Sequence, residues 1–177
     1  MSELYIQSDS LTATAQKLHA GDRIYLSGIV YTARDAAHKR IFAALENGDT
    51  LPFPLEGATI YYAGPTPAPE GLPIGSCGPT TSGRMDPYAP KLLDLGLIGM
   101  IGKGERSKEV CAAIQRNKAV YFCAVGGAGA LAARCVKSCE VIAFEDLGCE
   151  SIKKLEIQNF PLTVAIDCMG RNLFQRK

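Results

Sequence analysis

The chain has 177 residues, of which 47% are hydrophobic and 21% are charged, and its formal net charge is +1. This composition is typical of one globular domain with an ordinary core, and it excludes a disordered chain. The near balance of basic and acidic residues gives no support for a surface that binds nucleic acid or membrane.

We expect a single domain over residues 1–177, located in the cytoplasm. Apolar runs stay shorter than the roughly 18 residues that span a bilayer, and the N-terminal stretch has acidic residues where a secretory signal needs an apolar region. The seven cysteines include no CxxC pair, and their number is odd. We therefore expect no disulfide framework and interpret most cysteines as small buried hydrophobic residues rather than metal ligands.

The hydrophobic pattern predicts strands and helices in alternation. The expected strands cover residues 4–6, 23–31, 59–63, 97–102, 119–125 and 140–144, followed by two or three strands within residues 152–174. The expected helices cover residues 11–18, 36–47, 86–95, 107–117 and the segment after a Gly-rich turn at 126–129. The alternation after residue 97 predicts an α/β fold with a parallel or mixed sheet.

Punctuating residues support these boundaries. Asp35 is expected to be the N-cap of the second helix, and Gly48 is expected to end it. Asp86, followed by a proline, is expected to cap the third helix. Between them, residues 49–78 are dense in Pro and Gly, and a long loop of this kind inside a compact domain is more often functional or interfacial than idle.

Arg34 and His38 lie where the strand at residues 23–31 gives way to a helix. Ligands of α/β folds gather where strand ends meet helix N-termini, and a guanidinium there can bind a carboxylate through paired hydrogen bonds. His38 has an ordinary pKa near neutrality, which suits proton transfer. The alternatives are a surface arginine that pairs with Asp35 and a histidine that only packs or caps.

The stretch GPTTSGRMDP brings hydroxyls, a glycine and a guanidinium together directly before an expected helix. These residues are Thr80, Thr81, Ser82, Gly83 and Arg84. Backbone N–H groups at a helix N-terminus, together with hydroxyls and a fixed positive charge, make an anion site. The alternative is a Gly-Pro turn whose hydroxyls satisfy the backbone. A phosphate-binding P-loop is excluded, since its Gly spacing and Gly-Lys-Ser/Thr ending are absent.

Lys103 stands between two glycines at the expected end of a strand, and its alternative is a solvated turn lysine. The GGAG turn at residues 126–129 matches a dinucleotide fingerprint only loosely and is interpreted as tight packing. Three cations and several hydroxyls at one sheet edge fit a small polyanion such as a dicarboxylate clamped at both ends. The sequence has no HExxH motif and no nucleophile elbow, so we expect part of any catalytic machinery to lie elsewhere.

Five stretches of the sequence carry a resemblance to a known family, and they are GDRIYLSGIVYTARDAAHKR, YYAGP, GSCGPTTSGRMDPYAPKLLDLGLIGMIGKG, AVGGAGALAARCVK and FEDLGCESI. In this order, over about residues 21–167, they resemble the β subunit of class I, iron–sulfur-dependent fumarate hydratase. The same chain type corresponds to the C-terminal domain of one-chain fumarases and to the β subunit of L(+)-tartrate dehydratase.

The resemblance implies a swivelling β/β/α domain with a mixed sheet, in a hydro-lyase of the tricarboxylic acid cycle that reversibly hydrates fumarate to L-malate. It also implies a [4Fe–4S] cluster held by three cysteines of a partner α subunit, with one iron open to act as a Lewis acid on the departing hydroxyl. This chain would bind no metal itself. It would be active only with the α subunit, in a heterotetramer of two α and two β subunits with a β–β contact.

The resemblance further implies that a set of residues binds the substrate, namely Arg34, Thr81, Ser82, Gly83, Arg84 and Lys103. It implies that Thr80 is the catalytic base for the C3 proton and that His38 contributes to the site. A threonine hydroxyl is a weak base unless its alkoxide is stabilised, so Thr81 and Ser82 stay candidates for the same role. Two other functions stay open, an L(+)-tartrate dehydratase β subunit and a non-catalytic module for dicarboxylate binding or assembly.

Overall fold

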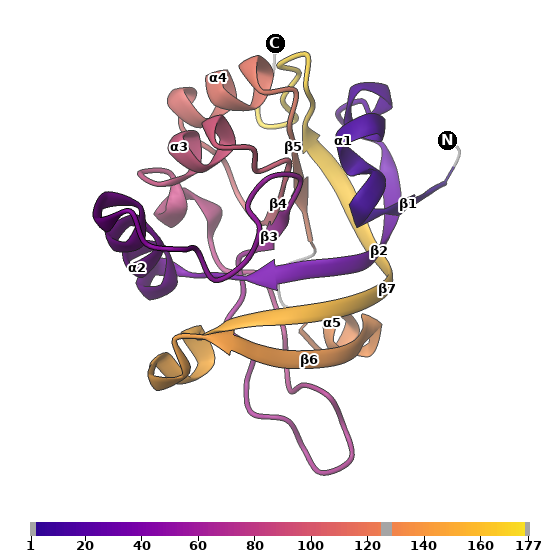
Figure 1. Ribbon diagram of the computed structural model, residues 1–177. Helices are drawn as coiled ribbons and strands as arrows, with labels where there is room; N and C mark the ends of the chain where they lie inside the picture. Colours follow the sequence, from indigo (N-terminus) through magenta and orange to yellow (C-terminus); the bar gives the residue numbers. More distant parts are fainter. Residues whose placement is uncertain (1–2, 125–128, 176–177) are drawn as a thin grey trace.

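The computed structural model of the protein describes residues 3–124 and 129–175 (Figure 1). Within these ranges the strands are β1 (Leu4–Gln7), β2 (Arg23–Thr32), β3 (Thr59–Tyr61), β4 (Gly99–Gly102), β5 (Val120–Cys123), β6 (Val136–Ala143) and β7 (Ile152–Ile166). The α-helices are α1 (Leu11–Thr14), α2 (Asp35–Asn47), α3 (Ala89–Asp94), α4 (Lys108–Arg116) and α5 (Gly129–Cys135). Short 3₁₀ helices are η1 (Ser8–Ser10), η2 (Ala15–Lys17), η3 (Ser82–Met85) and η4 (Glu145–Glu150).

The strands form one mixed sheet in the order β1-β2-β3-β4-β5-β7-β6, which confirms the predicted α/β fold with a mixed sheet. Strands β1 to β5 pair in parallel, and β7 runs antiparallel to β2, β5 and β6. Because β7 pairs with β2 as well as with β5, the pairings β2–β3–β4–β5–β7–β2 make a closed circuit. The carboxyl ends of the parallel strands therefore meet at one edge of this circuit.

The central strands of the sheet, β3 and β4, are buried on both of their faces. Every residue of β3 and β4 is buried, as is usual for inner parallel strands. Helices α3 and α4 pack against each other (Figure 1). The largest fully buried side chains are Tyr61, Tyr62, Tyr121, Phe122, Leu11, Ile24, Leu26, Ile41, Ile60, Met85, Leu92 and Leu93.

Strand β7 is a single strand of 15 residues, where the sequence predicted two or three strands. Its polar middle is accommodated by a bulge. Asn159 adopts a φ of +50°, and its backbone N–H donates to Ser27 Oγ at 2.9 Å, while the register with β2 shifts between Leu26 and Gly28. A bulge of this kind absorbs an extra residue without ending the pairing on either side.

The start of α2 differs from its prediction by one residue. Asp35 is the first residue of the helix, and Arg34 is the N-cap, without a capping bond from its side chain. The Asp35 carboxylate pairs instead with arginine side chains nearby. Gly48 ends the helix as predicted, with a φ of +69° and bonds to the last turn.

The predicted cap at Asp86 is wrong. Helix α3 begins three residues later, at Ala89, after the 3₁₀ turn η3. The Asp86 carboxylate accepts hydrogen bonds from Arg106 Nε and from the backbone N–H of Ser107, both at 2.7 Å. A buried charged partner competes better for this carboxylate than the N–H groups of a short helix would.

Strand β6 begins at Val136, four residues before the predicted start, and the helix predicted over residues 11–18 is α1 followed by the 3₁₀ turn η2. The predicted start of α4 agrees with the structure. Ser107 is the N-cap of α4, and its Oγ accepts the backbone N–H of Val110 at 3.2 Å. The interpretation of the Gly-rich turn as tight packing falls mainly on residues 126–128, which lie outside the described residues. In the described part of the chain, none of the helices has both the length and the apolar character needed to cross a membrane.

Candidate functional site

The candidate residues gather at the carboxyl ends of β2, β3 and β4. Strand β2 ends two residues before Arg34, and β4 ends immediately before Lys103. The loop that follows β3 crosses these strand ends. Within it, the Thr80 N–H donates to Tyr62 O at 2.6 Å, and the Ser82 N–H donates to Lys103 O at 2.9 Å. This is the edge where α/β folds bind ligands.

Asp35 brings the two candidate arginines to one carboxylate. Its Oδ1 accepts a hydrogen bond from Arg84 Nε at 3.1 Å, and its Oδ2 lies 4.0 Å from a terminal nitrogen of Arg34. On the other side, Glu150 Oε1 lies 3.9 Å from Arg34 Nε and accepts the backbone N–H of Ala36 at 3.4 Å. The Arg84 side chain is 54% exposed, whereas that of Arg34 is 24% exposed and its Nε is buried.

Three buried polar atoms in this turn have no hydrogen-bond partner among the described residues, namely Arg34 Nε, Asp35 Oδ2 and His38 Nε2. A buried polar atom without a partner costs about 1–3 kcal/mol, and such atoms are rare in native proteins. Because three of them lie in one helical turn, this turn is a candidate binding region.

His38 is fully buried and fixes the backbone of Arg34. Its Nδ1 lies 2.8 Å from the Arg34 carbonyl oxygen, and its ring lies between Tyr62 and Tyr88, with centroid distances of 5.7 and 5.4 Å. Because a carbonyl oxygen only accepts, Nδ1 carries the proton and Nε2 keeps a lone pair. Burial lowers the pKa of His38 to about 4, so the imidazole is neutral at pH 7.

Ser82 is also fully buried, and its hydroxyl holds the backbone of Lys103. Ser82 Oγ accepts the Lys103 N–H at 3.0 Å and lies 2.8 Å from Tyr121 Oη. A Cβ at Gly102 would overlap Ser82 Oγ, so the glycine before Lys103 is what permits this approach. The hydroxyl of Ser82 is therefore engaged in fixing the loop.

Three neighbouring loop residues are more accessible. Thr80 is half-buried, and Thr81 and Gly83 are exposed. Thr81 forms an isolated parallel β-bridge with Lys103, so the backbone of this loop is hydrogen-bonded to the end of β4. Of the three hydroxyls considered as a base, those of Thr80 and Thr81 are the accessible ones.

A buried ion pair that the sequence analysis missed, between Arg106 and Asp86, holds the end of this loop. Arg106 is 7% exposed, and it pairs with Asp86 at 2.7 Å and donates to Tyr62 Oη at 3.2 Å. Its guanidinium lies over the rings of Tyr62 and Tyr121, 5.2 and 4.8 Å from their centroids. The sequence offered no signal for Arg106, because nothing in its local pattern distinguishes it from a surface arginine.

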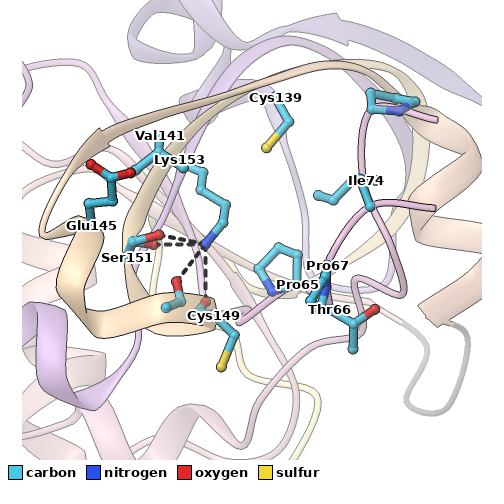
Figure 2. Close-up of a pocket in the computed structure, with 13 residues that line it drawn as sticks. Pro65, Thr66, Pro67, Ile74, Cys139, Val141, Glu145, Cys149, Ser151 and Lys153 are labelled. Carbon is cyan, nitrogen blue, oxygen red and sulfur yellow. Dashed lines mark hydrogen bonds between the residues drawn. The ribbon is translucent and has the colours of Figure 1, made fainter. Parts of the chain in front are cut away.

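A cavity of about 450 Å³ lies beside the candidate site (Figure 2). Its lining includes Pro65, Ile74, Cys139, Cys149 and Lys153, and none of the predicted site residues. Cys149 directly precedes the glutamate that lies beside Arg34, so the cavity and the site share the η4 segment. The predicted residues therefore form an open edge next to a cavity, not the cavity itself.

The described residues do not fit an iron–sulfur cluster. Among residues 3–124 and 129–175, no three His, Cys, Asp or Glu side chains come together in a way that could hold a metal ion. The cysteines are free thiols. Burial raises the pKa of Cys77 to about 12, which disfavours the thiolate that binds metal.

The chain matches known proteins over most of its length. The family model described as fumarase C-terminus matches residues 1–177. The chain is 40% identical to fumarate hydratase 1, mitochondrial, of Leishmania major and 39% identical to the aerobic class I fumarate hydratase of Escherichia coli, in each case over 87% of this chain and 28% of the relative. It is 38% identical to a putative L(+)-tartrate dehydratase subunit beta of Methanocaldococcus jannaschii, over 90% of this chain and 85% of that relative. The chain thus spans less than a third of those fumarate hydratases and most of that subunit.

Proposed function

The chain belongs to the fumarase C-terminus family, and from this premise we propose that it is the β subunit of a two-subunit hydro-lyase that reversibly hydrates fumarate to L-malate. The subunit role is supported by the relative named subunit beta, of which this chain covers 85%. We propose an α subunit as partner, in a cytoplasmic assembly of two α and two β subunits with a β–β contact. Since the described residues do not fit a [4Fe–4S] cluster, the proposal assigns that cluster to the α subunit.

The observation that carries the proposal is the pair of guanidinium groups at one carboxylate. Arg34 and Arg84 both lie within 4.0 Å of the Asp35 carboxylate, at the edge where Lys103 follows β4. Two arginines brought together at one carboxylate can bind the carboxylates of a small dicarboxylate through paired hydrogen bonds. Lys103 adds a third positive charge, and the loop residues Thr81, Ser82 and Gly83 complete the substrate-binding edge.

We assign the transfer of the C3 proton to the hydroxyl of Thr80, with Thr81 as the alternative. The Ser82 hydroxyl is already engaged with the Lys103 backbone, so it is poorly placed to take a substrate proton. A threonine hydroxyl is a weak base, and nearby positive charge favours its alkoxide and lowers its pKa. Arg84 and Lys103 supply that charge in this loop. His38, neutral and buried, contributes by holding the Arg34 backbone rather than by exchanging protons.

The test is to purify the chain with a cognate α subunit under anaerobic conditions and to follow the ultraviolet absorbance of fumarate. The complex should be active, and each subunit alone should be inactive. Thr80→Ala should lower kcat by at least about 100-fold, the usual size of a general-base contribution. Arg116→Ala, at an exposed ion pair with Asp94, is the matched control. Activity of the isolated chain, or full activity of Thr80→Ala, would contradict the proposal.

A second candidate function is the β subunit of an L(+)-tartrate dehydratase. It is favoured by one observation, namely that the relative matched over 85% of its own length carries that name. The two are distinguished by kcat/KM for fumarate and for L(+)-tartrate in the same preparation, because specificity is the ratio of these values. A non-catalytic binding module would instead bind dicarboxylates equally well with and without the α subunit.

A further inference from the structure

Lys153 places a positive charge among backbone oxygens at the wall of the cavity. Its Nζ donates to Ser151 Oγ at 2.8 Å and lies 3.3, 3.2 and 3.4 Å from the carbonyl oxygens of Gly148, Cys149 and Ser151, which share its remaining N–H groups. Figure 2 shows these bonds converging on one nitrogen. The residue is 8% exposed, and no carboxylate forms an ion pair with it in the described part of the chain. Carbonyl dipoles therefore take the place of a counter-ion.

The backbone of Lys153 ties the same segment to the end of β2. Its N–H donates to Thr32 Oγ1 at 3.1 Å, and the Thr32 hydroxyl donates to Ser151 O at 3.4 Å. Thr32 is fully buried and lies two residues before Arg34. The segment 148–151 is thus hydrogen-bonded both to the first residues of β7 and to the end of β2, the strand that precedes Arg34.

Glu150 is the residue of this segment that faces Arg34. Its Oε1 accepts the Ala36 N–H at 3.4 Å, at the first turn of α2, and lies 3.9 Å from Arg34 Nε. Gly64 packs against both partners, because a Cβ built there would lie 3.0 Å from Arg34 Cδ and 3.2 Å from Cys149 O. The glycine therefore permits the close packing of the Arg34 side chain and the Glu150 segment at this point.

We propose that Glu150 is a positioning residue for Arg34, and that Lys153 acts as an internal cation that holds the Glu150 segment in place. The inference rests on the proposed function, since it assigns the effect of this segment to the binding of a substrate carboxylate by Arg34. Without the Glu150 carboxylate, the Arg34 guanidinium can rotate away from the strand edge. The affinity for substrate then falls while the chemical step is largely preserved.

A competing interpretation is that Glu150 opposes the substrate by occupying Arg34. The geometry argues against it, because 3.9 Å between Oε1 and Nε is too long for a hydrogen bond that a substrate carboxylate would have to displace. The two interpretations predict opposite changes. Loss of a positioning group raises KM, whereas loss of a competing anion lowers it.

The cavity makes the role of Lys153 testable by chemical rescue. In Lys153→Ala, the missing part of the side chain corresponds in size to n-propylammonium, and the cavity that Lys153 lines is large enough to admit this ion. An ammonium that enters can donate to the same oxygens and restore the segment. The neutral 1-propanol, of similar size, has no charge and one donor, so it should not.

The experiment measures KM and kcat for fumarate in the complex with the α subunit. Glu150→Gln and Lys153→Ala should each raise KM about tenfold, which corresponds to about 1.4 kcal/mol, with kcat changed by less than about threefold. The double variant should be no worse than the poorer single variant, because both changes act through one segment. Addition of n-propylammonium, but not 1-propanol, should lower the KM of Lys153→Ala saturably. Glu145→Gln and Lys154→Ala, exposed residues of the same region, should leave both constants unchanged.

A lower KM in Glu150→Gln, additive effects in the double variant, or failure of rescue would each overturn the inference. If Lys153→Ala does not fold, Glu150→Gln still decides the sign of the KM change. The NMR signal of the Arg34 Nε–H in the chain alone is a readout independent of activity, and it should shift in Glu150→Gln and not in Glu145→Gln. An inactive wild-type complex would contradict the proposed function, and this signal would still decide whether Glu150 positions Arg34.

Discussion

Asp35 Oδ1 accepts a hydrogen bond from Arg84 Nε at 3.1 Å, so the first residue of α2 holds an arginine contributed by the loop after β3. An exposed ion pair of this kind stabilises the folded chain by only about 0–1 kcal/mol. Its larger effect is geometric, because it fixes the direction in which the Arg84 guanidinium points.

Replacement of Arg84 by lysine should therefore weaken substrate binding although the charge is kept. Lysine lacks the planar fork that binds a carboxylate through two hydrogen bonds, so Arg84→Lys should raise KM for fumarate about tenfold. Steady-state kinetics of the complex measure this. Arg40→Lys, at the exposed pair of Arg40 on α2 with Asp146, is the control and should leave KM unchanged. An unaltered KM in Arg84→Lys would remove Arg84 from the substrate-binding set.

Removal of the Ser82 hydroxyl should act on stability. In Ser82→Ala the part-buried N–H of Lys103 loses its acceptor, and the free energy of unfolding should fall by about 1–3 kcal/mol. Urea unfolding of the chain measures this, with Ser138→Ala on the exposed face of β6 as the control. A variant of unchanged stability whose complex has lost its activity would identify Ser82, and not Thr80, as the base.

The buried His38 makes stability depend on pH. The unfolded chain takes up a proton near the ordinary histidine pKa of 6.5, whereas burial keeps the folded imidazole neutral down to about pH 4. Between these values the unfolded state binds more protons, so stability falls as the pH is lowered, by about 2 kcal/mol from pH 7 to pH 5. Urea unfolding at the two pH values should show a smaller loss in His38→Gln. His19→Gln, at the exposed histidine, should keep the wild-type dependence.

The Arg106–Asp86 pair should be costly to break. Asp86→Asn leaves the guanidinium of Arg106 buried without its counter-charge, and the free energy of unfolding should fall by about 3–5 kcal/mol. Asp94→Asn breaks an exposed pair with Arg116 and should cost less than about 1 kcal/mol. Denaturant unfolding of both variants gives the comparison. Equal losses in the two would show that burial does not set the cost of breaking the pair.

The sequence predicted most elements of the fold because local signals decide them. Apolar runs identified the inner strands, and Ser107 and Gly48 identified helix ends, since their side chain or backbone conformation satisfies groups within one turn of the chain. The errors occurred where a residue forms its hydrogen bonds with partners that are distant in the sequence. Asp86 is recruited by Arg106, and the bulge at Asn159 is stabilised by Ser27, more than 100 residues away.

The same distinction applies to the site. Arg34, Arg84 and Lys103 could be named because strand ends, glycines and a family resemblance point to them. The pairing of Asp35 with Arg34 was one alternative from the sequence, but the bond of Asp35 to Arg84 and the role of Glu150 could not be predicted, because they depend on where the loop after β3 and the η4 segment lie in space. Ser82 illustrates the difference, since a serine in a hydroxyl-rich loop looks accessible in sequence and is fully buried in the structure.

Strand β7 follows all of its partners in the sequence, although it pairs with β2, β5 and β6. During synthesis on the ribosome, β2 therefore emerges long before the strand that covers its second edge. Until β7 arrives, that edge offers unpaired N–H and C=O groups that can recruit another nascent chain. Folding of this domain must then be completed after translation of β7, and a truncation before residue 152 should give an aggregating polypeptide rather than a smaller folded one.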